Sequence, residues 1–535
     1  MWTMRVFWPA AGCLILVAGI LEVTSALGET QTWDEGIHMV SGYTYLRLGD
    51  YSWNPEHPPL AKIMSALPLA VLHPDLPTSG EGWGRHDQTR FGIDFLYRNR
   101  LPADTILFAA RAMTMLLSLL FLTALAWWTR RHFGGAAALL ATALCAFDPN
   151  LIAHARYVTT DFPVTVFYFF AGVLFTDYLE SGRARDLAIA ATAFALALVT
   201  KFSALLLIPT LAALYGIRWL QKPSEFPLRR AAQAAGALIT AALAAIGIVY
   251  WPETLHEPAH RFFSGLNAVI THNAGGHASY LLGLRSDTGW WYYFPVVFAV
   301  KGTMAALAAT AALVGVGAWL CAMRRSGRAL DRFRAIPIIW IGLLAAPLIY
   351  FGVSMSSGID IGMRHLLPIY PFLYVATAAF FADLRWRRVA WFVMLALGAL
   401  QLAECASITP HYLAFFNAFA GGPGRGPDYL VDSNIDWGQD VKKLVKWLDA
   451  HGTRRAWCFY FGNAQLRYYG VDDQGMPAAM DQAGWEGIDG FAVANVTPLQ
   501  GVYVPLADLA PLRWREPMAK IGWSMYVYDL RKSRR

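Results

Sequence analysis

Long apolar runs separated by short polar segments occupy the first 407 residues of the chain. They centre on residues 6–27, 105–129, 134–151, 161–179, 186–200, 203–219, 231–251, 290–321, 335–355, 366–382 and 388–407. Most of these runs approach the ~20 apolar residues that an α-helix needs to cross a bilayer. The stretch 186–219 is interrupted only by Thr200-Lys201, where we expect one span to end and the next to begin. The pattern predicts a polytopic α-helical membrane protein with about eleven transmembrane helices.

Basic residues gather in alternate connections between the predicted spans. The clusters follow spans 2, 4, 6, 8 and 10, and they are Arg130/Arg131, Arg183/Arg185, Arg218 to Arg230, Arg324 to Arg334 and Arg385 to Arg388. Because cytoplasmic loops carry the excess of Lys and Arg, these connections predict a cytoplasmic N-terminus and an outer C-terminus in the cell membrane. The first run is long for a signal-peptide core, so we expect it to remain as an uncleaved span.

The pattern divides the chain into a transmembrane domain, residues 1–407, and a hydrophilic tail, residues 408–535. The first outer loop, residues 28–104, is expected to hold two helices. One should run from about Asp34 to Leu48, and the other should start at Pro58 and be bent or ended by Pro68. A further outer loop is expected at 252–289.

The tail has a different pattern of apolar residues. Val441, Leu444, Val445 and Leu448 form one face of a helix, and Gly452 follows as a stop signal. Strands are expected at 429–432, 456–461, 491–496 and 523–528, where β-branched and aromatic residues gather. The tail is therefore predicted to be a small α/β domain outside the cytoplasm.

Composition narrows the classes of function. Charged residues make up 15% of the chain, against about 25% in soluble proteins. The net charge of +7 is accounted for by the basic connections, and no basic stripe or motif indicates nucleic-acid binding. The five cysteines show no paired spacing, so neither a disulfide framework nor a zinc knuckle is predicted.

Two adjacent carboxylates, Asp34 and Glu35, directly follow the first span. A carboxylate held at this level can act as a general base on a hydroxyl group. The alternative is a solvated acidic start of a helix. In the same loop, the double proline of His57-Pro-Pro-Leu-Ala-Lys62 would fix the directions in which His57 and Lys62 project.

Further ionisable residues fall at the outer ends of later spans. They are Asp148, His154, Arg156, Asp161, Lys201, Arg364 and His365, while Lys301 lies deeper in span 8. Ionisable residues at this depth are costly and commonly functional. Carboxylates and cations on one membrane face suit a reaction on a lipid-linked phosphate, in which cations stabilise the leaving group. Transporter sites, by contrast, commonly lie near the midplane.

Five motifs carry a resemblance to a known family. They are Trp33-Asp-Glu-Gly, His57-Pro-Pro-Leu-Ala-Lys62, His154-Ala-Arg-Tyr-Val-Thr-Thr-Asp161, Lys201-Phe-Ser and Arg364-His-Leu-Leu-Pro-Ile-Tyr370. Together they resemble the protein O-mannosyltransferase family of C-class (GT-C) membrane glycosyltransferases, to which the bacterial aminoarabinose transferases are related. The resemblance covers residues 1–407 in order and topology. The tail motif Asp432-Ser-Asn-Ile-Asp-Trp-Gly-Gln-Asp440 is similar to tails of bacterial members.

The resemblance implies an inverting transfer of a sugar, such as mannose, from a polyprenyl-phosphate donor to an extracytoplasmic acceptor. It implies Asp34 as the base with Glu35 beside it, and Asp161 as a residue that organises the site. It implies a substrate-binding set of His57, Lys62, Arg156, Lys201, Arg364 and His365. No cofactor is expected. The acceptor stays open among lipid, glycan and protein, because the loop 252–289 is too short for the additional domain of eukaryotic protein mannosyltransferases.

Two other classes of function stay open from the sequence. One is a transporter or flippase of a lipid-linked glycan, and the other is a non-enzymatic membrane receptor or assembly factor. A divalent metal is a weaker alternative: Asp34 and His38 share a helix face and His57 could approach them, but no three-ligand motif is present. Asp432, Asp436 and Asp440 recur every four residues without the glycine and glutamate of a calcium loop.

Overall fold

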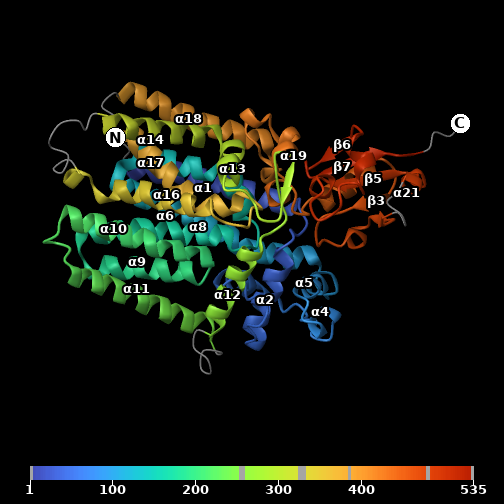
Figure 1. The fold of residues 1–535 in the computed structure, drawn as a ribbon, viewed down its shortest axis with the longest axis horizontal. Helices are drawn as coiled ribbons and strands as arrows, with labels where there is room; N and C mark the ends of the chain where they lie inside the picture. Colours follow the sequence, from blue (N-terminus) through green and yellow to red (C-terminus); the bar gives the residue numbers. More distant parts are fainter. Residues whose placement is uncertain (1–3, 252–259, 323–332, 384–386, 477–481, 532–535) are drawn as a thin grey trace.

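The computed structural model describes residues 4–251, 260–322, 333–383, 387–476 and 482–531. Helices dominate this part of the chain, and a small sheet follows them at the C-terminal end (Figure 1). The predicted fold class, a helical membrane protein with a small C-terminal α/β part, is confirmed.

Each of the eleven apolar runs contains a helix. The elements are α1 (Met4–Leu27), α6 (Ala103–Ala146), α8 (Asp161–Ser181), α9 (Ala184–Leu198), η1 (Phe202–Leu206) with α10 (Leu207–Gln221), α11 (Leu228–Val249), α13 (Tyr293–Lys301), α14 (Met304–Ala322), α16 (Ile338–Ser354), η3 (Met363–Ile369) with α17 (Tyr370–Asp383), and α18 (Arg387–Ile408). α6 covers two of the runs and is broken at Gly134, whose φ of 85° and ψ of 174° are not helical.

Fewer than eleven of these helices meet the length that a membrane requires. Among the described residues, seven are long and apolar enough to cross a membrane, or up to eight if α13 and α14, which meet at a bend of 119°, are one broken span. α9 and α16 have only 15 and 17 residues. The predicted number therefore counts apolar helical segments, several of which are shorter than a full span.

The first loop and the C-terminal sheet lie at the same end of the long helices, and the N-terminus lies at the other end (Figure 1). The turn between α10 and α11 is also at the N-terminal end (Figure 1). This arrangement agrees with the expected placement of the first loop and the tail on one face. The predicted basic connections at 324–334 and 385–388 lie largely outside the described residues.

The first loop is helical and largely buried at its start. Its elements are α2 (Glu35–Leu48), α3 (Leu60–Leu72), α4 (Glu81–Gly84) and α5 (Gln88–Tyr97). Both expected helices are present, but Pro68 lies inside α3 and does not end it. α2 and α3 cross closely at Gly42, where an added Cβ would lie 2.0 Å from the Lys62 carbonyl oxygen.

The C-terminal part holds a five-stranded sheet in the order β4-β3-β5-β7-β6. The strands are β3 (Arg455–Phe459), β4 (Asp472–Asp473), β5 (Phe491–Asn495), β6 (Ala519–Ile521) and β7 (Met525–Asp529). β3 pairs in parallel with β4 and β5, whereas β7 pairs antiparallel with β5 and β6. The expected helix is α20 (Val441–Ala450), whose Val441, Leu444 and Leu448 pack in one buried cluster with Val493 and Val527.

Short elements connect these parts. They are α7 (Pro149–Ala155), α12 (His260–Gly275), β1 (Ser279–Leu281), β2 (Leu284–Ser286), η4 (Tyr412–Ala414), η5 (Ala418–Ala420), η6 (Pro423–Arg425), α19 (Gly426–Tyr429), η7 (Asp432–Asn434), η8 (Leu466–Tyr469), α21 (Gln482–Glu486), α22 (Val496–Leu499) and α23 (Ala510–Arg513). The strand predicted at 429–432 was wrong, because the chain there leaves α19 and turns at Asp432, whose φ is 58°.

The segment 431–440, which we call the junction segment, joins the C-terminal sheet to the helices. All ten of its residues are buried. Its backbone pairs with the first loop: Trp33 N–H donates to the Trp437 carbonyl (3.0 Å), and Thr30 N–H donates to the Gln439 carbonyl (2.9 Å). Lys301, inside the helical part, donates to the Leu413 and Asn434 carbonyls. The tail is thus tied to the residues immediately before Asp34.

We expect Gly438→Ala to loosen this connection. Gly438 has φ of 84°, and an added Cβ would lie 2.8 Å from Gly462 Cα and 2.9 Å from the Tyr460 hydroxyl. Strain and overpacking together should cost about 1–3 kcal/mol, seen as a lower midpoint of thermal unfolding in detergent. Gly452→Ala is the matched control, since Gly452 also has positive φ (68°) but open space around it. Equal midpoints for both variants would contradict the close contact.

Candidate functional site

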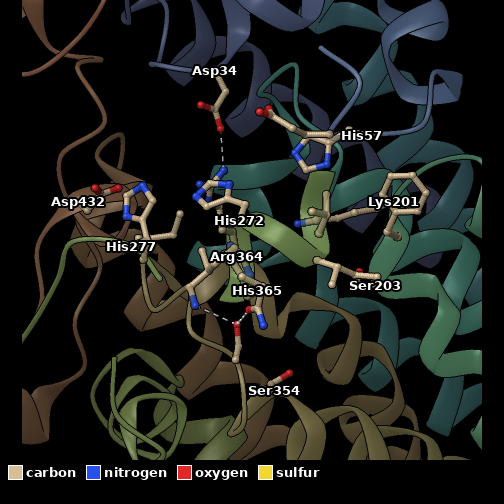
Figure 2. A pocket seen from close by; sticks show the side chains of 18 of the residues that line it. Asp34, His57, Lys201, Ser203, His272, His277, Ser354, Arg364, His365 and Asp432 are labelled. Atoms are coloured by element: carbon tan, nitrogen blue, oxygen red, sulfur yellow. Dashed lines mark hydrogen bonds and ion pairs between the residues drawn. The ribbon is translucent and has the colours of Figure 1, made fainter. Parts of the chain in front are cut away.

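A cavity of about 890 Å³ lies where the first loop, the helical part and the C-terminal part meet. Its lining includes Trp33, Asp34, Ile37, His38, Asn54, Glu56 and His57 of the first loop; Lys201, Ser203, Tyr350, Ser354, Arg364 and His365 of the helical part; His272, Asn273 and His277 of the region after α11; and Asp432, Trp437, Phe461 and Tyr503 of the C-terminal part. Figure 2 shows the side chains of Asp34, His57, Lys201, Arg364 and Asp432, among others that it labels, around one shared space.

Asp34 is the predicted catalytic carboxylate that reaches this cavity. It immediately precedes α2, and its Oδ2 accepts a hydrogen bond from the Arg364 guanidinium at 2.8 Å (Figure 2). The Asp34 side chain is 24% exposed, so one partner holds it while the cavity still has access to it. Arg364 in turn lies 4.5 Å from the centroid of the Trp437 ring, which fixes the plane of the guanidinium.

Asp161 holds two cations at the cavity wall. It is the first residue of α8 and is buried. Its carboxylate lies 2.5 Å from Lys201 Nζ and 3.6 Å from Arg364. Both cations line the cavity but Asp161 does not, so it holds them from outside the cavity lining.

His57 and His365 also reach the cavity, and each has a buried ring nitrogen with no hydrogen-bond partner among the described residues. Burial lowers the pKa of His57 well below its usual value, and the neighbouring His38 and Lys201 lower it further. His57 is therefore a neutral imidazole at pH 7, available to donate or accept a hydrogen bond to a bound molecule.

Four predicted site residues lie outside the cavity lining: Asp161, described above, and Glu35, Lys62 and Arg156, each of which has structural partners. Glu35 is fully buried and accepts hydrogen bonds from Arg111, from the Val158 amide, and from the amide and hydroxyl groups of Thr32. It fixes the start of α2, and we therefore assign it a positioning role instead of one at the reacting atoms.

Lys62 and Arg156 are buried and do not line the cavity. Lys62 donates to the carbonyls of Asn54 and His57 at 2.7 Å each and to the Asn54 side chain. Arg156 is fully buried and pairs with Glu29, which also accepts from Tyr157. We therefore place both in the scaffold of the first loop, away from bound substrate.

The C-terminal part contributes residues that the sequence analysis did not place in the site. Asp432 and Trp437 come from the aspartate-rich tail motif, and Phe461 and Tyr503 come from loops around the sheet. The motif was visible in the sequence, but its contact with the first loop was not. In the described part of the chain, no cluster of three His, Cys, Asp or Glu side chains has the geometry to hold a metal ion.

One family model matches part of the chain. Residues 103–251 match the family model "Dolichyl-phosphate-mannose-protein mannosyltransferase". No curated protein matches the sequence. The fold is similar to that of ArnT from Cupriavidus metallidurans bound to undecaprenyl phosphate, with 13% identity, a TM-score of 0.49, and coverage of 97% of this chain and 98% of that one. The structure of the same protein in the apo state has 14% identity and a TM-score of 0.49, and the match covers 96% of this chain and 96% of that one. At this identity and TM-score the similarity does not establish a shared activity.

Proposed function

From the match of residues 103–251 to the mannosyltransferase family and from the geometry of the cavity, we propose that this protein is a membrane glycosyltransferase. It moves a sugar from a polyprenyl-phosphate donor to a hydroxyl group of an acceptor outside the cytoplasm, with inversion at the anomeric carbon. The observation that carries the proposal is the Asp34–Arg364 pair beside Lys201 in one cavity at the end of the long helices.

The proposed reaction uses Asp34 as a general base. The acceptor oxygen forms a bond to the anomeric carbon while the bond from that carbon to the phosphate oxygen breaks, and Asp34 takes the hydroxyl proton. The phosphate leaves with its extra negative charge, and Arg364 and Lys201 stabilise it. Both cations are already held in place by Asp161, so little reorganisation is needed as this charge develops.

The apolar part of the cavity suits the prenyl chain of the donor. Leu205 and Leu206 line it beside Lys201, and Leu266, Val269 and Ile270 line it from α12. A lipid that reaches the cavity from the membrane would therefore present its phosphate to Lys201 and Arg364 while its chain stays among apolar side chains. We also propose that the protein lies in the inner membrane with the cavity facing outward. Mannose is the candidate sugar.

We expect Lys201→Met to raise the half-saturating donor concentration about tenfold, because the loss of one charged hydrogen bond is worth about 1.5–3 kcal/mol. The measurement is the initial rate of transfer against the concentration of polyprenyl-phosphate mannose in detergent micelles. Lys222→Met is the matched control, since Lys222 is 42% exposed and pairs with Glu225 across one turn. A donor half-saturation unchanged by Lys201→Met would remove this residue from phosphate binding.

Mass spectrometry of glycolipids, polysaccharides and secreted proteins from cells with and without the gene tests the proposed function as a whole. The proposal expects one class of molecule to lose a fixed sugar mass when the gene is deleted. It also expects wild-type protein, but not Asp34→Asn, to restore that mass. Movement of an unchanged lipid-linked glycan without loss of any sugar mass would instead indicate a transporter.

A further inference from the structure

Asp432 and Tyr503 meet at the cavity wall in strained backbone conformations. Their φ angles are 58° and 64°, in the left-handed region that side chains other than glycine rarely adopt. The Tyr503 hydroxyl donates to Asp432 Oδ2 at 2.9 Å, and both residues line the cavity. Strained residues gather at binding and catalytic sites, where the surrounding structure holds them. The Asp432–Tyr503 pair therefore combines two features that are typical of binding sites, a strained backbone and a place in the cavity wall.

Three aromatic rings extend from this pair to Asp34. Trp33 stacks on Phe461 with ring centroids 5.0 Å apart, and Phe461 stacks on Tyr503 at 5.4 Å with an interplanar angle of 7°. All three line the cavity, and Trp33 is the residue directly before Asp34. The rings thus make a continuous aromatic wall between the carboxylate of the first loop and the C-terminal part.

The junction segment and the sheet loops fix the position of this aromatic wall relative to Asp34. The Trp33 amide donates to the Trp437 carbonyl, and the Asn463 side chain donates to the Trp33 carbonyl at 2.9 Å. Both sides of the Trp33 backbone are therefore fixed by the C-terminal part. A shift of that part would move the aromatic wall and Asp34 together.

The cavity has two chemically different sides. In the view of Figure 2, Lys201 and Ser203 lie on one side, Asp432 and His277 lie on the other, and Asp34 and Arg364 lie between them. The Lys201 side belongs to the helical part, from which a membrane lipid would enter. An inverting displacement needs the leaving phosphate and the attacking hydroxyl on opposite sides of the anomeric carbon. The C-terminal side is therefore the position from which the acceptor approaches.

We propose that Trp33, Phe461, Tyr503 and Asp432 form an acceptor subsite for a neutral sugar ring, presented by a glycan or a glycolipid. The parts of the stacked rings that line the cavity contact the C–H groups of a pyranose, while Asp432 and the Tyr503 hydroxyl bind its hydroxyl groups. The Asp432 carboxylate disfavours an anionic group at this position. This inference rests on the proposed function. In the transfer step, one hydroxyl of this ring loses its proton to Asp34 and gains the anomeric carbon of the donor.

The test uses the full-length protein with polyprenyl-phosphate mannose as donor and two sets of acceptor probes, neutral methyl glycosides and a Ser/Thr-containing peptide. We expect the wild-type protein to transfer labelled mannose to a methyl glycoside.

We expect Tyr503→Ala to raise the half-saturating concentration of that glycoside at least tenfold, while the half-saturating concentration of the donor stays within twofold. Tyr503→Phe, which keeps the ring and loses only the hydroxyl, should give a smaller rise and controls for folding. Trp514→Ala is the matched control, since Trp514 is an 86% exposed aromatic residue of the same part of the chain.

The outcomes separate the two proposals. If the wild-type protein transfers mannose to neither set of probes, the proposed function is rejected for this donor and the subsite loses its basis. If methyl glycosides accept the sugar but Tyr503→Ala and Tyr503→Phe leave their half-saturation unchanged, the subsite is rejected and the transferase activity stands. If only the peptide is labelled, the proposed sugar class of acceptor is rejected.

Discussion

Replacing Asp34 with Asn is expected to lower the rate of sugar transfer by about 10²–10⁴-fold, the usual contribution of a positioned general base. Asparagine has the same shape as aspartate and its carbonyl oxygen can still accept from Arg364, so the cavity should keep its form. It cannot take the proton of the acceptor hydroxyl. Donor half-saturation should therefore stay within a few-fold of the wild-type value while the maximal rate falls.

This loss can be measured as initial rates with labelled donor in membranes, normalised to the amount of folded protein. Asp75→Asn is the matched control, because Asp75 lies in the same first loop, is 57% exposed and pairs with Arg100 at the surface. It should retain the wild-type rate. If Asp34→Asn also kept the wild-type rate, the base would have to be another group.

Replacing Glu35 with Ala should produce the opposite phenotype, a loss of folded protein. The Glu35–Arg111 pair is almost fully buried, with side chains 0% and 1% exposed and atoms 2.6 Å apart. Removing the carboxylate leaves the Arg111 charge buried without its counter-ion, which costs about 3–5 kcal/mol. We expect a marked drop in the midpoint of thermal unfolding and in the monodisperse fraction after solubilisation.

Glu81→Ala provides the comparison for this change. Glu81 is 50% exposed and pairs with the 76% exposed Arg85, so its loss should cost about 0–1 kcal/mol. We thus expect different phenotypes at the two adjacent carboxylates. Asp34→Asn should be folded and inactive, whereas Glu35→Ala should be unstable. A stable Glu35→Ala protein without transfer activity would show that Glu35 acts at the reacting atoms after all.

The hydrophobic pattern predicted the helical architecture well because each apolar run must satisfy its own backbone hydrogen bonds, which a helix does locally. It predicted the number of spans less well. Gly134 breaks α6 within one continuous element, and α9 and α16 are too short to be counted by length alone. The β-branched and aromatic residues predicted β3, β5 and β7 but not the short strands β4 and β6. No strand forms at 429–432, where long-range contacts of Asp432 override the local preference.

The individual roles of the charged residues were harder to predict. The family resemblance implied Lys62 and Arg156 as substrate-binding residues, but in the structure both are held by groups that the motifs do not reveal. The partner of Arg156 is Glu29, and the partners of Lys62 are backbone carbonyls of its own loop. Charge alone does not tell a buried scaffold pair from a ligand-binding cation.

The contribution of the tail to the cavity was also outside the reach of local patterns. Tyr503 and Asp432 lie 71 residues apart in sequence, and Asn463 contacts Trp33 across 430 residues. Such contacts depend on how the sheet docks on the helices, which one sequence does not specify. The tail motif at 432–440 was noticed for its aspartates, but the structure uses Asp436 to accept from Asn495 and Thr497 within the tail, while Asp432 faces the cavity.

In the proposed mechanism, a sugar is transferred covalently from a lipid phosphate in this cavity, with Asp34 as the base. The most direct measurement is a single turnover of purified protein in lipid vesicles with polyprenyl-phosphate mannose labelled in the sugar. We predict that wild-type protein releases one polyprenyl phosphate for each sugar joined to acceptor, with the anomeric configuration inverted, and that Asp34→Asn binds the donor without releasing it. Labelled sugar that crosses the vesicle still joined to its lipid, or equal release by Asp34→Asn, would contradict this mechanism.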